Sequence, residues 1–174
     1  TLPKIEEVRV VDKSLKRSET YAREMRGFGI SVVPVKNVKD AVVDSEILVT
    51  VTPSVKPIVM NDWIRNGTHI NAIGADAPGK EELDPSILLR SKVVVDDFEQ
   101  AIHSGEVNVP ISRGIMRKED IYGEIGEVIT GKKRGRMSND EITVFDSTGL
   151  AIQDVATAWM VYRKATATKR IKML

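Results

Sequence analysis

Hydrophobic and polar positions along the chain alternate between two periods. Short apolar runs rich in Val and Ile recur between stretches in which apolar residues return every three or four positions. The apolar runs predict strands at residues 7–12, 30–35, 46–53, 68–74, 92–97 and 141–149. Helices are predicted between most of these strands, and such alternation is typical of a parallel sheet covered on both faces. We therefore predict a doubly wound α/β fold.

Several predicted elements have recognisable ends. Asp84 caps a helix whose first turn contains Pro85, where the missing N–H of proline has no intrahelical partner to lose. Pro34 lacks a backbone donor, so the strand around it is predicted at an edge of the sheet or at its own end. From residue 105 to 139 the pattern weakens, and glycine and proline punctuate two short helical pieces.

Two predicted helices carry apolar faces. The helix that starts at Ser14 and ends at Gly27 and Gly29 has Leu15, Ser18, Ala22 and Met25 on one face. The last segment, from Leu150, has Ile152, Val155, Ala156, Trp159 and Met160 on one face. An aromatic residue on such a stripe is typical of a core or an interface, although it could also stack on a ligand. We divide the chain into an α/β domain, residues 1–149, and a C-terminal helix, residues 150–174.

Composition excludes several classes of protein. The 174 residues include 26 Lys plus Arg and 25 Asp plus Glu, and the net charge of +1 gives no argument for nucleic acid or a membrane surface. No apolar run approaches the roughly 18 residues of a membrane span, and nothing resembles a signal peptide. The absence of cysteine excludes disulfides and thiol catalysis and suits a reducing cytoplasm. His69 and His103 lie far apart, so we predict no metal site.

Small or polar residues gather where the predicted strands end. These residues are Asp12, Thr50, Thr52, Pro53, Gly74, Asp76, Asp96, Asp97, Asp146, Ser147 and Thr148. In an open parallel sheet, ligands bind outside the carboxyl ends of the strands. We therefore expect Asp12, Thr50, Asp76 and Ser147 to surround one bound nucleotide.

Asp12 has two interpretations. An acid that ends the second strand of a dinucleotide-binding unit accepts hydrogen bonds from ribose hydroxyls and disfavours a 2′-phosphate, which favours NAD over NADP. An aspartate after a strand also often caps the next helix. The Gly-rich turn of such a unit lies about 20 residues before the acid. Only eleven residues precede Asp12, so we expect that turn upstream of Thr1.

Two glycine motifs inside the chain do not supply the missing turn. The GFG motif at residues 27–29 leaves a predicted helix, and we interpret it as a helix C-cap. The GEIG motif at residues 123–126 follows no predicted strand. The basic stretch at residues 131–136 is flanked by glycine, which is typical of a solvated surface turn.

The corner GADAPGK, residues 74–80, carries the candidate chemistry. Gly74 and Ala75 let the backbone approach a flat ring closely, and Asp76 follows where a substrate amine or imine would meet a nicotinamide. A carboxylate there could stabilise an iminium cation or move a proton, and Lys80 could neutralise a phosphate or ribose oxygen. Asp, Pro and Gly also form plain turns, so a turn without a ligand is the alternative.

Four ordered blocks of sequence resemble the ornithine cyclodeaminase/mu-crystallin family, which includes archaeal-type alanine dehydrogenases and imine reductases. The blocks are GTHINAIGADAPGKEELDPSIL, VVVDDFEQAIHSGEVNVPIS, GEVITGKKRGR and DEITVFDSTGLAIQDVATA, residues 67–88, 93–112, 126–136 and 140–158. The resemblance covers only the later half of a family member. It implies a Rossmann-type, doubly wound parallel sheet that lacks its first strand and Gly-rich turn in this chain.

The resemblance also implies roles for particular residues. Asp76 matches the catalytic acid/base, or partner of the substrate amine, of the family. The implied NAD contacts are Asp12, Thr50, the backbone of Ile70, Asn71, Ala72 and Ile73 in the nicotinamide half of the site, Lys80, and Ser147 near the nicotinamide amide. The Lys and Arg residues that grip the substrate belong to the region that precedes the part matched here.

The implied activity of the parent protein is hydride transfer between the Cα of an amino acid and NAD, through an imine. Ornithine cyclodeaminase, which makes proline and ammonia from ornithine, is the first expectation; alanine dehydrogenase or an imine reductase is the alternative. A non-catalytic module that binds NAD or another ligand is a further possibility. The resemblance implies a homodimer in which the C-terminal helix packs on an N-terminal substrate and dimerisation region, and the absence of cysteine suits a cytoplasmic protein. Without that region we expect the chain alone to be inactive.

Overall fold

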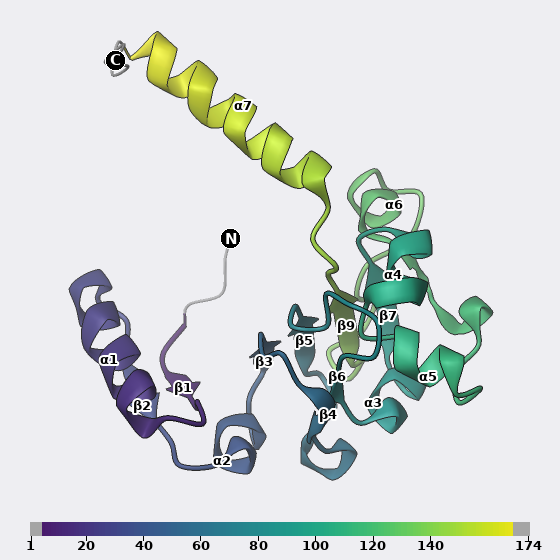
Figure 1. The fold of residues 1–174 in the computed structure, drawn as a ribbon, viewed down its shortest axis with the longest axis horizontal. Coiled ribbons are helices and arrows are strands. Elements are labelled where there is room, and N and C mark those ends of the chain that lie inside the picture. The colour runs from purple at the N-terminus through teal and green to yellow at the C-terminus, as the bar shows by residue number, and fades with distance from the viewer. Residues whose placement is uncertain (1–4, 169–174) are drawn as a thin grey trace.

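The computed structural model describes residues 5–168, which form a parallel α/β structure (Figure 1). The strands are β1 (Val8–Val10), β2 (Val32–Pro34), β3 (Ile47–Thr50), β4 (Val55–Val59), β5 (His69–Ala72), β6 (Glu81–Leu83), β7 (Lys92–Val95), β8 (Gly123–Glu124) and β9 (Thr143–Asp146). The α-helices are α1 (Leu15–Met25), α2 (Val38–Val42), α3 (Pro85–Leu89), α4 (Phe98–Ser104), α5 (Asn108–Ser112), α6 (Ile125–Ile129) and α7 (Ala151–Ala167).

A five-stranded sheet forms the centre of the molecule. Its order is β3-β5-β9-β7-β8, and every pair of neighbouring strands is parallel. The strand β9 comes last in the chain but lies between β5 and β7, so the connections cross over the sheet. Parallel neighbours and crossovers confirm the predicted doubly wound α/β class.

The core lies where the central strands meet α3. Alternate residues of β5, β7 and β9, such as Ile70, Val93 and Val144, are buried and pack with Leu88 of α3. The helix α3 begins as the sequence predicts, because the Asp84 side chain accepts a hydrogen bond from the backbone N–H of Ser86 at 2.9 Å.

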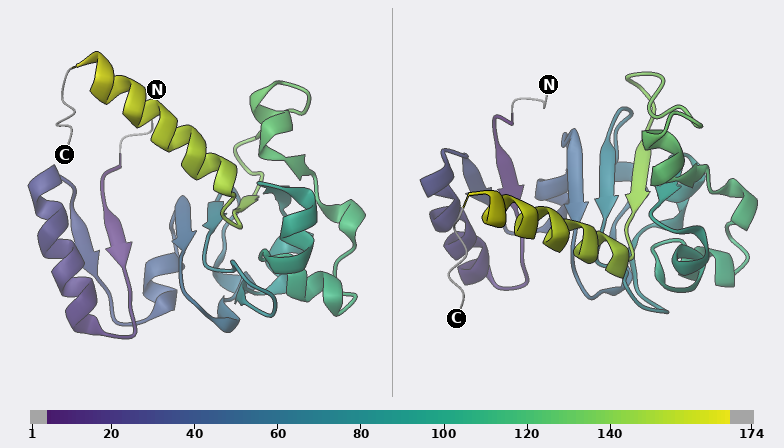
Figure 2. Two further views of the ribbon diagram at one scale, coloured as in Figure 1. Left: turned by 45° about the horizontal axis from the view of Figure 1, so that its top comes forward. Right: turned by 90° about the horizontal axis from the view of Figure 1, so that it is seen from above.

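The strands β1 and β2 form a separate two-stranded sheet beneath α1, and within residues 5–168 neither strand pairs with β3 (Figure 2). Pro34 ends β2, as its missing donor predicts. Ser18 and Ala22 of α1 are buried, whereas Leu15, predicted on the same face of the helix, is exposed.

Three strands were not predicted from the sequence. The strands β4 and β6 form a small parallel sheet, in which Val59 lies opposite Leu83. The strand β8 pairs with β7, so the GEIG motif itself forms a strand that leads into α6. The element before the motif is a 3₁₀ turn at residues 118–120, so the motif follows no strand, as expected; β8 lies within the motif, and a two-residue strand is too short to produce a periodic pattern.

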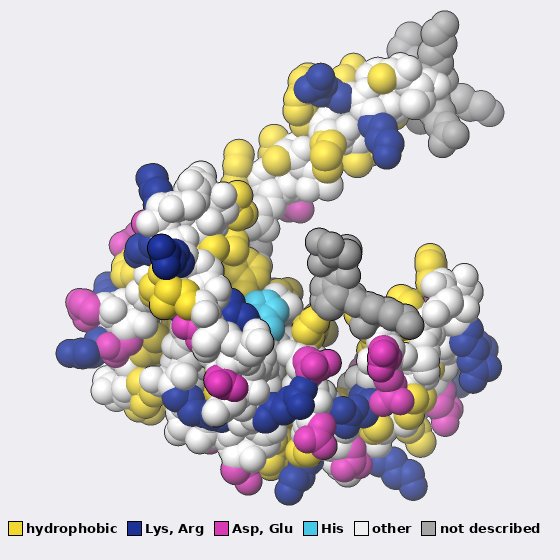
Figure 3. All heavy atoms as spheres, turned by 180° about the vertical axis from the view of Figure 1, so that it is seen from behind, with side chains coloured by type: hydrophobic (Ala, Val, Ile, Leu, Met, Phe, Trp, Pro, Cys, Tyr) yellow, Lys and Arg dark blue, Asp and Glu magenta, His cyan; other side chains and the backbone are white. Residues whose placement is uncertain are grey.

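The helix α7 extends away from the sheets (Figure 1) and runs from the end of β9 toward the side of the molecule that carries α1 (Figure 2). Its apolar side chains, among them Trp159 and Met160, are exposed (Figure 3). No helix among residues 5–168 is both long enough and apolar enough to cross a membrane.

Candidate functional site

The carboxyl ends of three strands lie side by side at one edge of the central sheet. Thr50 of β3, Ala72 of β5 and Asp146 of β9 are in register. Just beyond them, the backbone N–H of Ile73 donates to the Thr50 carbonyl at 2.9 Å, and the N–H of Ser147 donates to the Ala72 carbonyl at 3.0 Å. The structure therefore brings Thr50, Ile73 and Ser147 together.

Asp76 projects from the corner that follows β5. The backbone of the corner folds tightly, with the Asp76 N–H donating to the Gly74 carbonyl at 3.1 Å and the Lys80 N–H donating to the Ala77 carbonyl at 3.2 Å. Residues 74–80 therefore form a turn, as their composition predicts, and the Asp76 carboxylate is exposed on it. A hydrogen bond from the Lys80 ammonium group lowers the pKa of Asp76, so that this carboxyl is ionised at neutral pH.

Lys80 forms an ion pair with Asp76 from the opposite end of the same turn. Its ammonium group therefore already has a carboxylate partner close to the predicted substrate position. A contact between Lys80 and a cofactor stays a prediction. To make it, the Lys80 ammonium group would have to leave Asp76 or contact both Asp76 and the cofactor.

The predicted nicotinamide lining, residues 70–73, is only partly at the surface. Ile70 and Ala72 have exposed fractions of 0%, and their strand pairs with β3 on one side and β9 on the other. Asn71 is half-buried, and Ile73 is 37% exposed where the strand ends. Ile70 and Ala72 thus support the site from within the core, because a central strand uses its backbone groups for pairing and leaves Ile73 to face a ligand.

Thr50 and Ser147 differ in how their hydroxyls are held. The Thr50 Oγ1 is buried and has no hydrogen-bond partner among residues 5–168. The Ser147 hydroxyl donates to the Asp96 carboxylate at 3.3 Å, and the same carboxylate accepts from the backbone N–H groups of Thr148 at 2.7 Å and Gly149 at 3.1 Å. Asp96, which the sequence placed at a strand end without a role, therefore orders the segment that carries Ser147.

Asp12 lies away from this edge. It follows β1 on the two-stranded sheet (Figure 1), and its Oδ1 accepts a hydrogen bond from the Ser14 N–H at 2.7 Å, just before α1. The N-cap of α1 is Ser14, so Asp12 does not cap the helix and instead orders the turn that leads into it. The carboxylate is exposed, so a ribose contact stays a prediction.

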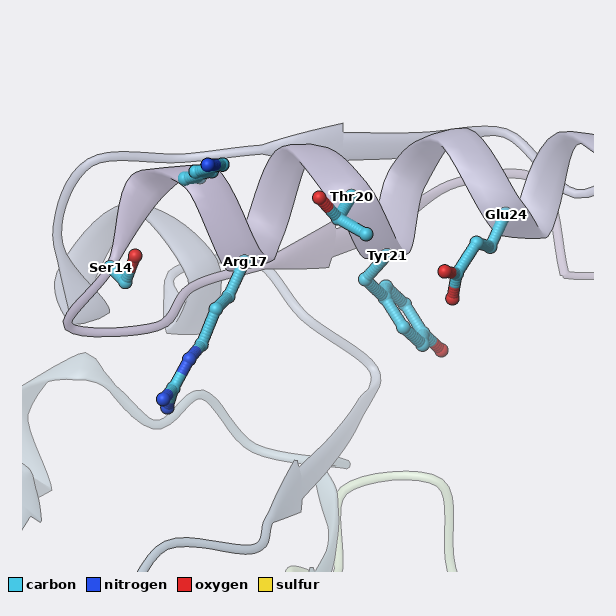
Figure 4. Close-up of a pocket in the computed structure, with 6 residues that line it drawn as sticks. Ser14, Arg17, Thr20, Tyr21 and Glu24 are labelled. Carbon is cyan, nitrogen blue, oxygen red and sulfur yellow. The ribbon is translucent and has the colours of Figure 1, made fainter.

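A shallow pocket near Asp12 lies on the surface of α1 (Figure 4). It is lined by Ser14, Lys16, Arg17, Thr20, Tyr21 and Glu24. Arg17 and Tyr21 project from the same side of the helix. The pocket belongs to one helix face and is separate from the strand ends that carry Thr50 and Ser147.

Buried carboxylates that the sequence did not assign connect the loops behind the edge. Glu106 Oε1 accepts from the backbone N–H groups of Glu82 at 2.8 Å and Leu83 at 2.6 Å, and the Asp146 carboxylate accepts from those of Glu106 at 2.9 Å and Val107 at 3.1 Å. Burial raises the pKa of Glu106 to about 8 and that of Asp146 to about 7. The strand-end position could have indicated Asp146, whereas the charged run that contains Glu82 gave no signal of burial.

Comparison with known proteins identifies the family. Residues 1–169 match the model of the "Ornithine cyclodeaminase/mu-crystallin family". The chain belongs to the ornithine cyclodeaminase/mu-crystallin family. The resemblance found in the four sequence blocks is thereby confirmed.

Among curated members of the ornithine cyclodeaminase/mu-crystallin family, an alanine dehydrogenase of Archaeoglobus fulgidus is 53% identical over 156 residues, which are 90% of this chain and 47% of that protein. A Delta(1)-pyrroline-2-carboxylate reductase of Bacillus cereus is 35% identical over 164 residues, which are 92% of this chain and 50% of that protein. The chain therefore spans about half the length of these curated relatives.

Solved structures of the family agree with the fold. An archaeal alanine dehydrogenase dimer with bound NAD matches with a TM-score of 0.89 and 49% identity, covering 97% of this chain and 52% of that one. A Thermococcus litoralis Delta(1)-pyrroline-2-carboxylate reductase in complex with NADH and L-proline matches with a TM-score of 0.89 and 37% identity. The match covers 94% of this chain and 51% of that one. These matches confirm the Rossmann-type assignment.

Proposed function

We propose that this chain is the NAD-binding part of an oxidoreductase that interconverts an amino acid and its imine. The observation that carries the proposal is the strand edge, where Thr50, Ile73 and Ser147 are adjacent and Asp76 projects from the next corner. Relatives named as an alanine dehydrogenase, a pyrroline-carboxylate reductase and an iminosuccinate reductase support the same reaction class.

The residues at this edge fit a dinucleotide. The unpartnered hydroxyl of Thr50 is a polar group that a ligand could satisfy, and Ile73 offers an apolar surface for a flat ring. Asp12 offers an exposed carboxylate for ribose hydroxyls, and Lys80 is the candidate cation for the cofactor. Three structural neighbours were solved with NAD or NADH, which supports NAD as the cofactor.

Asp76 is the group that we assign to the chemistry. When bound, NAD supplies the hydride acceptor for the Cα of the amino acid. Asp76 is an exposed carboxyl whose pKa Lys80 lowers further below its ordinary value, so it carries a negative charge at neutral pH that would stabilise the positive charge developing on the substrate nitrogen. The same carboxylate can accept a proton from that nitrogen. Ser147, held by Asp96, would orient the amide of the nicotinamide.

Alanine is the substrate that the comparisons favour. The alanine dehydrogenase relative is 53% identical, whereas the structures named as a lysine cyclodeaminase and a probable ornithine cyclodeaminase are 28% and 26% identical. The sequence analysis placed ornithine cyclodeaminase first. We now propose alanine dehydrogenase as the first candidate and ornithine cyclodeaminase as the second.

We propose that the C-terminal helix, residues 150–174, packs on a substrate and dimerisation region of the kind that occupies the other half of the relatives. The exposed apolar stripe of α7, with Trp159 at 60% exposure, supports this role, and the archaeal neighbour is named as a dimer. Residues 169–174 lie outside the described part of the helix. The chain alone should not turn over, because it supplies only part of the residues that position a substrate.

The test measures NADH fluorescence with a polypeptide that contains this chain and the family-sized region before it. Alanine plus NAD should produce NADH, and pyruvate plus ammonia should consume it. Asp76→Asn should lower kcat by about 100-fold or more, because a positioned acid/base contributes about that factor. Asp62→Asn, at an exposed aspartate of a surface turn, is the control.

Other results would change the assignment. Proline and ammonia formed from ornithine would replace alanine dehydrogenase with ornithine cyclodeaminase. NAD binding without turnover of any substrate would favour a non-catalytic binding module. A failure of the longer protein to bind NAD would refute the proposal.

A further inference from the structure

Glu82 lies behind the corner that carries Asp76 and is fully buried. One of its carboxylate oxygens accepts a hydrogen bond from the Thr52 N–H at 2.6 Å, and the other accepts from the Gly74 N–H at 3.0 Å. Thr52 follows β3, and Gly74 follows β5. A single carboxylate therefore joins the two loops that leave neighbouring strands at the candidate site. We call these two hydrogen bonds the Glu82 clamp.

The clamp explains why residue 74 is glycine. A Cβ at Gly74 would lie well under 3.0 Å from the backbone N and O of Thr52 and from Glu82 Oε2. Backbone atoms on one side and a fully buried carboxylate on the other leave little room for adjustment. The close approach of the two loops therefore depends on both Glu82 and the absence of a side chain at Gly74.

Buried groups hold Glu82 itself in place. Glu106 accepts hydrogen bonds from the backbone N–H groups of Glu82 and Leu83, and Asp146 at the end of β9 accepts from that of Glu106. The clamp is thus connected to a central strand through successive hydrogen bonds. Such an arrangement keeps the Glu82 carboxylate at a fixed distance from the sheet edge.

We propose that Glu82 is a positioning residue, whose carboxylate joins the loops after β3 and β5 and thereby fixes the direction in which Asp76 projects. Glu82 does not touch the reacting atoms in this arrangement, and it acts through the backbone between Gly74 and Asp76. The catalytic consequence rests on the proposed function, whereas the structural consequence can be measured on the chain itself.

The first experiment uses NMR on the 174-residue chain. The Thr52 and Gly74 amides lie outside the strands, so the clamp predicts that both exchange with solvent slowly in the unmodified chain. In the Glu82→Gln variant, the glutamine NH₂ group replaces one of the two acceptor oxygens, so one of the two backbone N–H groups loses its hydrogen bond. The backbone amide of Thr52 or of Gly74 should therefore exchange with solvent about tenfold faster. The Asp76 amide resonance should shift as well.

Glu81→Gln is the matched control. Glu81 is also buried, but its carboxylate lies 3.4 Å from the exposed Arg113 and takes no part in the clamp. Its replacement should leave the exchange of the Thr52 and Gly74 amides unchanged. Gly74→Ala provides a second disruption and should shift the Asp76 resonance in the same way if Glu82→Gln does not fold.

The second experiment uses the longer protein described above. Glu82→Gln should lower kcat about tenfold or more while the KM for NAD changes less than about threefold, because misplacement of a catalytic group affects the chemical step most. Glu81→Gln should change neither constant. A loss of fold alone would not separate kcat from KM in this way.

The outcomes are separable. Fast exchange of both amides in the unmodified chain, or an Asp76 resonance that does not respond to Glu82→Gln or Gly74→Ala, would overturn the proposal. An unchanged kcat in an active Glu82→Gln enzyme would overturn it as well. If the unmodified longer protein is inactive, the proposed function fails, and the NMR results still decide whether Glu82 positions Asp76.

Discussion

Glu106 should make the stability of this protein fall as pH rises. Its side chain is fully buried, Oε1 accepts two backbone hydrogen bonds, and Oε2 has no partner among residues 5–168. Burial raises its pKa from 4.5 to about 8, and the charge of Asp146 acts in the same direction. The perturbation that tests this is Glu106→Gln, which keeps an acceptor for the two N–H groups and removes the titration.

Proton linkage gives the sign and the size of the change in the free energy of unfolding with pH. Between pH 4.5 and about 8 the folded chain holds a proton on Glu106 that the unfolded chain has released. The stability from this group is complete below pH 4.5 and is lost as pH rises through about 8. The loss amounts to about 1.4 kcal/mol for each pH unit, and to at most about 5 kcal/mol over the whole range. Glu106→Gln should remove the contribution of Glu106 to this slope and leave that of Asp146, whose pKa is raised from 3.8 to about 7 and whose contribution therefore ends near pH 7.

Urea unfolding from pH 5 to pH 8 measures the effect. The chain has two Trp residues, of which Trp63 packs against the core and Trp159 is exposed on α7. Fluorescence in a Trp159→Phe background therefore reports on the core. The exposed Glu19 of α1 provides the control variant, Glu19→Gln. Parallel stability curves for the Glu106→Gln and unmodified chains would refute the reasoning.

Two further predictions concern neighbouring pairs of residues. Leu88→Ala should lower the free energy of unfolding by about 2–5 kcal/mol, because Leu88 is 1% exposed. Leu89→Ala should change the free energy of unfolding by less than about 0.5 kcal/mol, because Leu89 is 53% exposed. Equal losses in urea unfolding would contradict the packing described here. Lys80→Met should raise the pKa of Asp76 toward its ordinary value by removing the donor, and a carbon NMR titration that shows no rise would contradict the ion pair.

The strands that form the core could be predicted because their own sequences carry the signal. Residues 92–97 contain a continuous Val run, and residues 68–74 and 141–149 are rich in apolar and β-branched residues; all three segments contribute central strands. The start of α3 was predictable for a similar reason, since Asp84 and Pro85 act within one turn of the helix. Local chemistry determined these elements.

The buried carboxylates could not be predicted, because their partners are distant in the sequence. Glu82 bonds to Thr52, 30 residues away, and Glu106 bonds to Leu83, 23 residues away. The pattern of hydrophobic and polar residues around such a glutamate does not distinguish it from a glutamate exposed to solvent. The burial of Ile70 has the same origin, since it depends on which strands pair on either side of β5.

The same reasoning applies to Asp76. Its corner was predictable from the turn residues around it, but its ion pair with Lys80 depends on how the turn closes. The family resemblance implies a chemical role for this residue, and that role stays a prediction; the structure adds that Lys80 lowers the pKa of Asp76.

The separate two-stranded sheet has a consequence for how the molecule opens. The strands β1 and β2 hydrogen-bond to each other, and the Arg9 guanidinium, which donates to the Asp40 carbonyl at 2.8 Å, links them to α2. Opening of residues 8–34 therefore breaks no ladder of the central sheet, and we expect this segment to open as a cooperative unit of its own. A ligand that contacts both Asp12 and the edge at Ser147 would join the two units and slow the opening of the first.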